Sequence, residues 1–246
     1  MKNFKLIIEY DGSCFHGWQR QKNMATVQEE IEKAIFTMTL QKVTLSGSGR
    51  TDAGVHAMAQ VANFCCHTDL SADIFLRGLN SLLSSGITIH NCISVHEDFH
   101  ARYDAVSKIY HYHIINSRWP SAVFRNHCWF VKKKLDIDKM NIAAKYLIGS
   151  HDFKSFEGSG SPRKSTVRRV ITAAFVKDRT GVFVFKIEAD GFLRYMVRNI
   201  VGTLIDIGSG RTSVDQFYDI LSSKNRNNAG ITAPPQGLFL MCVKYS

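Results

Sequence analysis

The order of strands and helices predicted by the hydrophobic pattern limits the folds open to this chain more than any other feature. In the first half, apolar residues alternate along four short segments, as in strands, and recur every three or four positions along two longer ones, as in helices. The expected strands cover 4–10, 43–46, 55–65 and 87–95, and the expected helices cover 24–40 and 71–83. Thr26 and Glu29 have the spacing of a capping box at the start of the first helix. The order is therefore β-α-β-β-α-β.

The second half follows the same order in outline. Its expected elements are a strand over 106–115, a helix over 136–149, a hairpin around 178–181, a helix over 191–207 and a strand over 237–245. We also expect two additional elements in the second half, a strand near 128–131 and a short helix capped by Ser213 and Gln216. We predict an α+β fold of two tandem ferredoxin-like subdomains, over residues 1–105 and 106–246, whose mainly antiparallel sheets line a basic cleft.

Positive charge is concentrated in the second half. Residues 1–105 hold 9 Lys and Arg against 11 Asp and Glu, whereas residues 106–246 hold 22 against 10. This asymmetry favours a polyanionic partner, nucleic acid before membrane, with a merely solubilising basic surface as the alternative. Because no apolar stretch resembles a membrane span or a signal peptide, and the six cysteines lack the spacing of a metal site, we expect a cytoplasmic protein with free thiols.

A single acid, Asp52, stands out within the glycine-rich segment Gly47–His56. Glycines permit tight turns and let the backbone approach a ligand closely, so a carboxylate in such a loop is positioned for chemistry. The segment does not match a phosphate-binding P-loop, because Arg50 replaces the required lysine and Thr44 replaces the first glycine. Asp52 is therefore the leading candidate for a catalytic residue.

Two residues of the second half are candidates to act with Asp52. Arg198 interrupts an otherwise apolar helix, and a buried guanidinium needs a carboxylate such as Asp52. The alternative is an arginine that snorkels from the helix edge or pairs locally with Asp206. Tyr110 lies on a predicted strand, where a tyrosine serves either as a core residue or as a stacking surface. Two histidines alternate along the same strand, but without a third ligand at a matching spacing we expect no metal site.

Ordered motifs spread over nearly the whole chain carry a family resemblance. They are Tyr10–Gln21, Gly49–Ala57, Phe99–Arg102, Lys108–Tyr112, Phe192–Gly202 and Pro234–Leu238. In these the chain resembles the tRNA pseudouridine synthase A family, enzymes that isomerise uridines in the anticodon stem and loop of tRNA. The resemblance implies that Asp52 is the nucleophile, that Tyr110 stacks on the target base and that Arg198 pairs with Asp52. It also implies that Leu238 packs beside the base and that Arg50 helps to fill the space left by the flipped nucleotide.

The resemblance further implies a tRNA partner modified at positions 38, 39 and/or 40, a homodimer, and a reaction that needs no cofactor. Candidate contacts to phosphate are Arg20, Arg163, Lys164, Arg168 and Arg169, with basic loops at 157–165 and 222–230. Three chemical routes are open: attack on the base, attack at C1′, and proton removal from C2′ with Tyr110 as the base. The alternative function is that of a noncatalytic RNA-binding or RNA-folding protein on the same fold.

Overall fold

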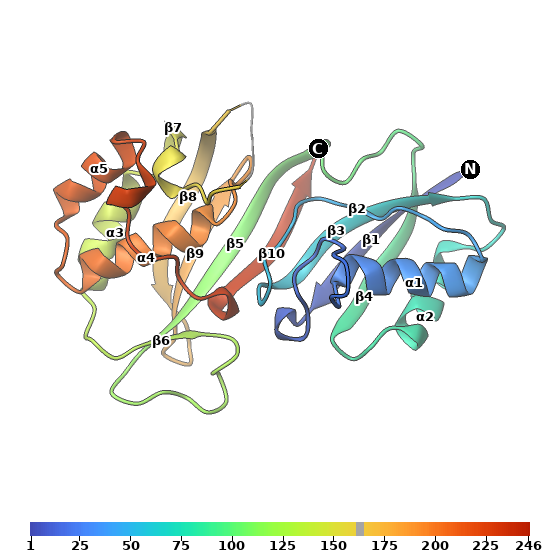
Figure 1. Ribbon diagram of the computed structural model, residues 1–246, viewed down its shortest axis with the longest axis horizontal. Coiled ribbons are helices and arrows are strands. Elements are labelled where there is room, and N and C mark those ends of the chain that lie inside the picture. Colours follow the sequence, from blue (N-terminus) through green and yellow to red (C-terminus); the bar gives the residue numbers. More distant parts are fainter. Residues whose placement is uncertain (161–164) are drawn as a thin grey trace. The chain divides into compact units, whose positions relative to one another are not determined.

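The computed structural model describes residues 1–160 and 165–246, and the chain divides into two compact units (Figure 1). The first unit comprises Met1–Val106 together with Phe239–Ser246, and the second comprises Ser107–Leu238. The C-terminal strand thus belongs to the first unit, whereas the sequence order alone groups it with the second half. Among the described residues, no helix is both long enough and apolar enough to cross a membrane.

A four-stranded sheet in the order β4-β1-β3-β10 is the frame of the first unit. Its central strand β1 (Lys2–Tyr10) is antiparallel to both β3 (His56–Cys66) and β4 (Ile87–Val95). Two strands pair with the side of β3 that faces away from β1. β10 (Leu238–Tyr245) is parallel to the first residues of β3, and the two-residue β2 (Ser46–Gly47) is antiparallel to a later part of β3.

Helices α1 (Val27–Thr39) and α2 (Ala72–Leu82) pack together in the first unit. Alternate residues of β1 are buried, as expected for a strand with one face on a core. Three aromatic rings join the sheet to α2: the ring centroid of Phe4 lies 5.4 Å from that of Phe64 and 4.7 Å from that of Phe75. This cluster fixes the helix layer on the sheet.

The second unit contains a five-stranded sheet in the order β6-β5-β9-β8-β7. The strands are β5 (Ala105–Asn116), β6 (Trp129–Val131), β7 (Gly149–Asp152), β8 (Val167–Lys177) and β9 (Phe183–Ala189). Only the short β5–β6 pair is parallel, and the other pairs are antiparallel.

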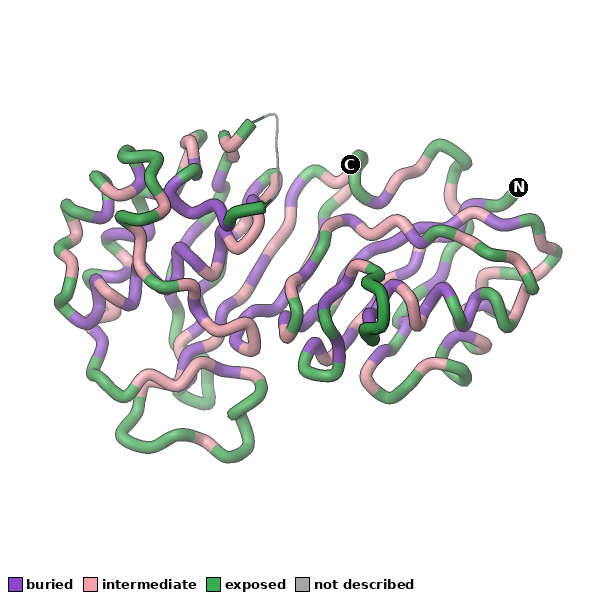
Figure 2. Tube along the Cα trace, in the orientation of Figure 1, coloured by how far each residue is buried: buried purple, intermediate pink, exposed green. Residues whose placement is uncertain are grey.

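Three helices pack against one another in the second unit: α3 (Ile137–Lys145), α4 (Met196–Gly208) and α5 (Val214–Ser222). α3 also contacts β8, which places the helix layer on the sheet. Short 3₁₀ turns occur at Gly12–Cys14, Lys154–Phe156, Arg226–Asn228 and Pro235–Gly237, labelled η1 to η4. In both units buried residues follow the strands and the inward faces of the helices, while connecting segments are largely exposed (Figure 2).

The prediction of a mixed α/β chain with mainly antiparallel strands is confirmed. The capping box predicted for Ser213 and Gln216 at α5 is also present. The tandem ferredoxin-like description and the basic cleft stay predictions. The helix predicted over 191–207 begins later, at Met196, because Tyr195 takes a left-handed conformation (φ 61°) that ends the preceding turn.

The capping box predicted at Thr26 is wrong. α1 does begin directly after Thr26, but the threonine side chain makes no capping bond, and its Oγ1 has no hydrogen-bond partner among the described residues. The reason is that another segment caps this helix. The carbonyls of Gly17 and Trp18 accept from the first two helical amides, those of Val27 and Gln28, at 3.3 and 3.1 Å.

Candidate active site

Asp52 lies in the loop between β2 and β3 of the first unit, where it is half-buried. Its backbone carbonyl accepts from the amide of Val55 at 3.1 Å, which closes a four-residue turn. Gly54 occupies the third position of that turn with φ 78°, a conformation that favours glycine. The glycine after the acid is therefore required by the turn that positions the carboxylate.

A second segment, Tyr10–Gln21, packs against the backbone of the Asp52 loop so closely that side chains are excluded. A Cβ atom on Gly17 would lie 2.8 Å from the Thr51 carbonyl oxygen, and one on Gly12 would lie 2.1 Å from the Val55 carbonyl oxygen. The amide of Trp18 donates to the Thr51 carbonyl at 3.1 Å. These contacts explain why two distant glycine-containing motifs occur together in one chain.

Buried polar groups hydrogen-bond to the residues that precede Asp52 in its loop. The hydroxyls of Tyr10 and Thr51 are hydrogen-bonded at 2.7 Å, and burial raises the pKa of Tyr10 to about 12. Gln60 on β3 donates to the Gly49 carbonyl at 2.9 Å and accepts from the Ser48 hydroxyl at 2.6 Å. Because each of these groups is satisfied inside the protein, the loop is rigid at its base.

Arg50 is connected to α1 through a chain of amides. Its Nε donates to Gln19 at 2.9 Å, Gln19 donates to Gln28 at 2.9 Å, and Gln28 donates to Glu32 at 3.0 Å. The Arg20 guanidinium forms an ion pair with the same Glu32, while its side chain remains 53% exposed. Both arginines are thus oriented by the fold, and their contacts to RNA stay predictions.

Tyr110 lies on β5 in the second unit, opposite Ile187 of β9. It is 8% exposed, and its ring meets the edge of Phe192 with centroids 5.0 Å apart. Two residues farther along β5, Tyr112 is completely buried and donates to the Pro234 carbonyl at 2.7 Å. This bond ties β5 to the segment that leads into Leu238.

Arg198 projects from α4 and is half-buried. Its Nε donates to the Ala233 carbonyl at 2.7 Å, and its guanidinium lies 5.0 Å from the ring centroid of Tyr195. Asp206, the alternative partner within the helix, instead accepts from Arg211 at 3.0 Å. The local alternative therefore has no support.

Leu238 is the first residue of β10 and is 6% exposed. The preceding Gly237 lies against Tyr112, where a Cβ atom would be 2.8 Å from the ring. Asp52 and Arg50 thus belong to the first unit, and Tyr110 belongs to the second. Arg198 and Leu238 also belong to the second, so the meeting of these side chains with Asp52 stays a prediction.

Comparison with known proteins places these features in a family. The model for a family described as tRNA pseudouridine synthase matches residues 6–104 and 143–246. The chain is similar to proteins named tRNA pseudouridine synthase A from Thermoanaerobacter sp. (strain X514), at 47% identity, Acetivibrio thermocellus, at 48%, and Pseudothermotoga lettingae, at 40%. Each alignment runs over 245 residues and covers 100% of both chains. The chain belongs to the tRNA pseudouridine synthase family.

The family match covers the Asp52 loop and the segment packed against it, together with α4 and β10. Residues 105–142, which include Tyr110, lie between the two matched ranges. This part of the chain is nevertheless aligned in the full-length relatives.

Of the remaining predicted phosphate contacts, Arg168 and Arg169 lie on β8. Arg163 and Lys164 are outside the described residues. Arg168 is half-buried, and its guanidinium donates to the Ser165 carbonyl at 3.1 Å. Arg169 is exposed, and because successive strand residues point to opposite faces, the two arginines cannot grip the same phosphate.

Arg226, which the sequence places in a basic surface loop, is turned inward. Its guanidinium donates to the carbonyls of Ala229 and Gly230 at 3.2 and 2.9 Å. It also donates to the side chains of Asn199 and Thr232, both at 3.1 Å. Burial lowers the pKa of this guanidinium. Arg226 therefore binds segment 229–233, whose last carbonyl accepts from Arg198. These bonds favour a positioning role over the predicted contact with phosphate.

Substitution of Arg226 tests that role. Arg226→Met removes four hydrogen bonds to partly buried acceptors, so we expect a loss of roughly 2–4 kcal/mol in the free energy of unfolding, seen as a melting temperature lower by about 4–12 °C. We also expect lower turnover at saturating RNA with an unchanged dissociation constant. Lys224→Met is the matched control, because Lys224 is exposed and pairs only with Asp152 at the surface. Weaker RNA binding with unchanged stability would restore the phosphate-contact interpretation.

Proposed function

We propose that this protein isomerises uridine to pseudouridine at positions 38, 39 and/or 40 of the tRNA anticodon stem-loop. The observation that carries the proposal is Asp52, held on a turn that two glycine-containing segments build, in a chain of the tRNA pseudouridine synthase family. A noncatalytic RNA-binding protein has no use for a carboxylate at a surface that meets phosphate, because the charges repel.

The reaction exchanges one bond for another. The bond from C1′ of ribose to N1 of uracil breaks and a bond from C1′ to C5 forms; C5 loses a proton and N1 gains one. Since no electrons are transferred and no group is donated, the conversion calls for no cofactor. An ionised Asp52 serves as the nucleophile, either at the base or at C1′.

The target nucleotide must leave the base stack before Asp52 can reach it. In the proposed complex Tyr110 stacks on the flipped base, Leu238 packs beside it and Arg50 fills the vacated space. Arg198 pairs with Asp52 and favours its ionised form. The proposal includes a homodimer in which both chains contact one tRNA through a basic cleft.

The direct test uses an unmodified tRNA transcript with uridines at positions 38, 39 and 40. Purified protein is incubated with it in the absence of added cofactor, and the digested nucleosides are analysed for pseudouridine. Transcripts in which each of the three uridines is replaced by cytidine assign the positions. We expect pseudouridine that disappears with specific replacements. Tight tRNA binding without any pseudouridine would favour the noncatalytic RNA-binding alternative.

A further inference from the structure

The segment from 116 to 134 of the second unit, here named the basic arm, carries positive charge without any acid. It contains five basic residues and no Asp or Glu: Arg118, Arg125, Lys132, Lys133 and Lys134. All five are exposed, and none forms an ion pair with another described residue. The arm has no counterpart in the family-model match, which leaves out residues 105–142.

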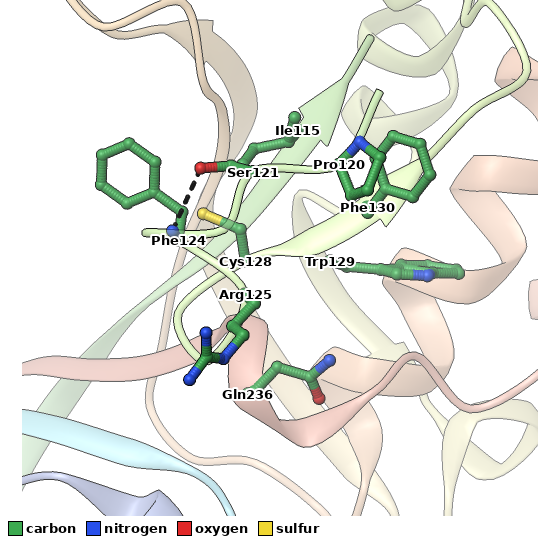
Figure 3. A pocket seen from close by; sticks show the side chains of 9 residues that line it. All are labelled: Ile115, Pro120, Ser121, Phe124, Arg125, Cys128, Trp129, Phe130 and Gln236. Atoms are coloured by element: carbon green, nitrogen blue, oxygen red, sulfur yellow. Dashed lines mark hydrogen bonds between the residues drawn. The ribbon is translucent and has the colours of Figure 1, made fainter. Parts of the chain in front are cut away.

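The arm borders a hollow that is lined in part by aromatic residues. A pocket of about 260 Å³ is lined by Pro120, Phe124, Trp129 and Phe130, with the polar ends of Arg125 and Gln236 at its side (Figure 3). Phe124 is 40% exposed, so part of its ring is available for contact. A mixed lining of ring faces and hydrogen-bonding groups suits a nucleobase, which has two apolar faces and a polar edge.

A second hollow on the same arm has a cationic lining. It measures about 330 Å³ and is lined by Arg118, Lys132 and Lys134, together with Asn116 and Ser117. Because this lining holds three cations and no carboxylate, it suits a phosphate group. One segment thus offers an aromatic site and a cationic site.

The two ends of the arm are anchored in the second unit. Asn116 donates to the carbonyls of Val131 and Lys133, each at 2.7 Å, and accepts from the amide of Leu135 at 3.0 Å. The ring of Trp129 meets the buried ring of Tyr112 with centroids 6.2 Å apart. Through Tyr112 the arm is linked to Pro234 and so to the segment that ends at Leu238.

The nearby acids are occupied by local partners. One oxygen of Asp178 accepts from the amides of Thr180 and Val182 and from the Thr180 hydroxyl, at 2.8–2.9 Å. Asp136 pairs with Lys139 at 3.2 Å. In the part of the chain that the structure describes, neither acid forms an ion pair with a cation of the arm.

We propose that the basic arm binds an unpaired nucleotide of the tRNA substrate outside the nucleotide being modified. The base lies against the ring of Phe124, and Lys132 and Lys134 bind its phosphate. The identity of the RNA rests on the proposed function, whereas the binding of a nucleotide by the arm rests on the two hollows themselves.

The test compares two double variants that remove the same charge from the same unit. Lys132→Gln with Lys134→Gln alters the arm, and Lys145→Gln with Lys177→Gln alters two exposed lysines outside the arm. The dissociation constant for a tRNA transcript is measured from low to moderate salt. For the arm variant we expect an affinity about three- to tenfold weaker at ~0.1 M salt and a salt dependence whose slope falls by about 2. The control variant should bind like the unmodified protein.

Phe124→Ala examines the aromatic hollow separately. We expect tRNA affinity to fall about fivefold or more, because a stacked base loses its platform. In this variant and in the arm variant, the tRNA concentration that gives half-maximal pseudouridine formation should rise by the same factor as the dissociation constant. Equal binding by the unmodified protein and both arm variants would overturn the proposal, as would a loss of turnover at saturation with unchanged binding. Failure of the proposed function would give a different result. The unmodified protein would then form no pseudouridine, while the differences in tRNA binding between the variants would persist.

Discussion

Replacement of Asp52 by asparagine is expected to abolish pseudouridine formation while leaving tRNA binding intact. Asparagine keeps the size of the side chain, and the turn at this position is closed by the backbone carbonyl of residue 52, so the loop should retain its shape. What is lost is the charge that makes the carboxylate a nucleophile. We expect turnover below about one-thousandth of that of the unmodified protein.

The measurement is a single-turnover assay with tRNA transcript and excess protein, alongside a binding titration. Asp69→Asn is the matched control, since Asp69 is exposed in the same unit and its loss removes the same charge. Affinity for tRNA should change by no more than about twofold, because one carboxylate is a small part of the electrostatic footprint. Turnover within tenfold of normal, or binding lost together with turnover, would contradict the assignment of Asp52 as the nucleophile.

The fold could be predicted from the sequence wherever burial imposes a local period. β1 alternates buried and partly exposed residues, and its predicted range of 4–10 lies within the observed strand. The strand predicted over 43–46 is present only as the two-residue β2 (Ser46–Gly47), because side chains of α1 bind the backbone of Leu45: Glu32 accepts from the Leu45 amide at 2.8 Å and Gln28 donates to its carbonyl at 3.2 Å. The apolar alternation over residues 43–46 gives no information about Gln28 and Glu32, which lie far from this segment in the sequence.

Two other features lacked a local signal. β7 (Gly149–Asp152) has no apolar alternation, because its four residues are glycine, serine, histidine and aspartate, and its pairing with β8 defines it. The joining of β10 to β3 in the first unit depends on which edge is free, a property of the folded sheet. Local periodicity therefore gives the existence of an element more readily than its partner.

The same distinction holds for the candidate site. Asp52 could be found from its glycines, because tight turns and close backbone contacts demand that residue type locally. The hydrogen bonds that link Arg50 through Gln19 to α1 could not be predicted, because a series of hydrogen-bonded side-chain amides has no characteristic spacing in the sequence. Arg226 has the composition of a solvated loop, and only its four internal hydrogen bonds reveal an inward orientation.

Gly202→Ala is expected to have the largest effect on stability. Gly202 lies within α4, and a Cβ atom there would be 1.7 Å from the Ile231 carbonyl oxygen, a distance that forces the backbones apart. Segment 229–233 cannot move freely, because Arg226 binds its carbonyls and Ala233 exchanges hydrogen bonds with Arg198. We expect a loss of about 3 kcal/mol or more, and a melting temperature lower by at least about 6 °C.

The control is Gly78→Ala in α2, where the added methyl group would meet only the end of the flexible Met38 side chain. Alanine is favoured over glycine within a helix by about 1 kcal/mol, so this variant should melt at or above the temperature of the unmodified protein. Gly202→Ala should also lower turnover at saturating tRNA, because the Ala233 carbonyl that holds Arg198 is displaced with the segment. A Gly202→Ala protein as stable and as active as the control would contradict this prediction. It would mean that segment 229–233 moves away from α4 without a loss of stability, and that the contacts made by Arg226 do not position Arg198.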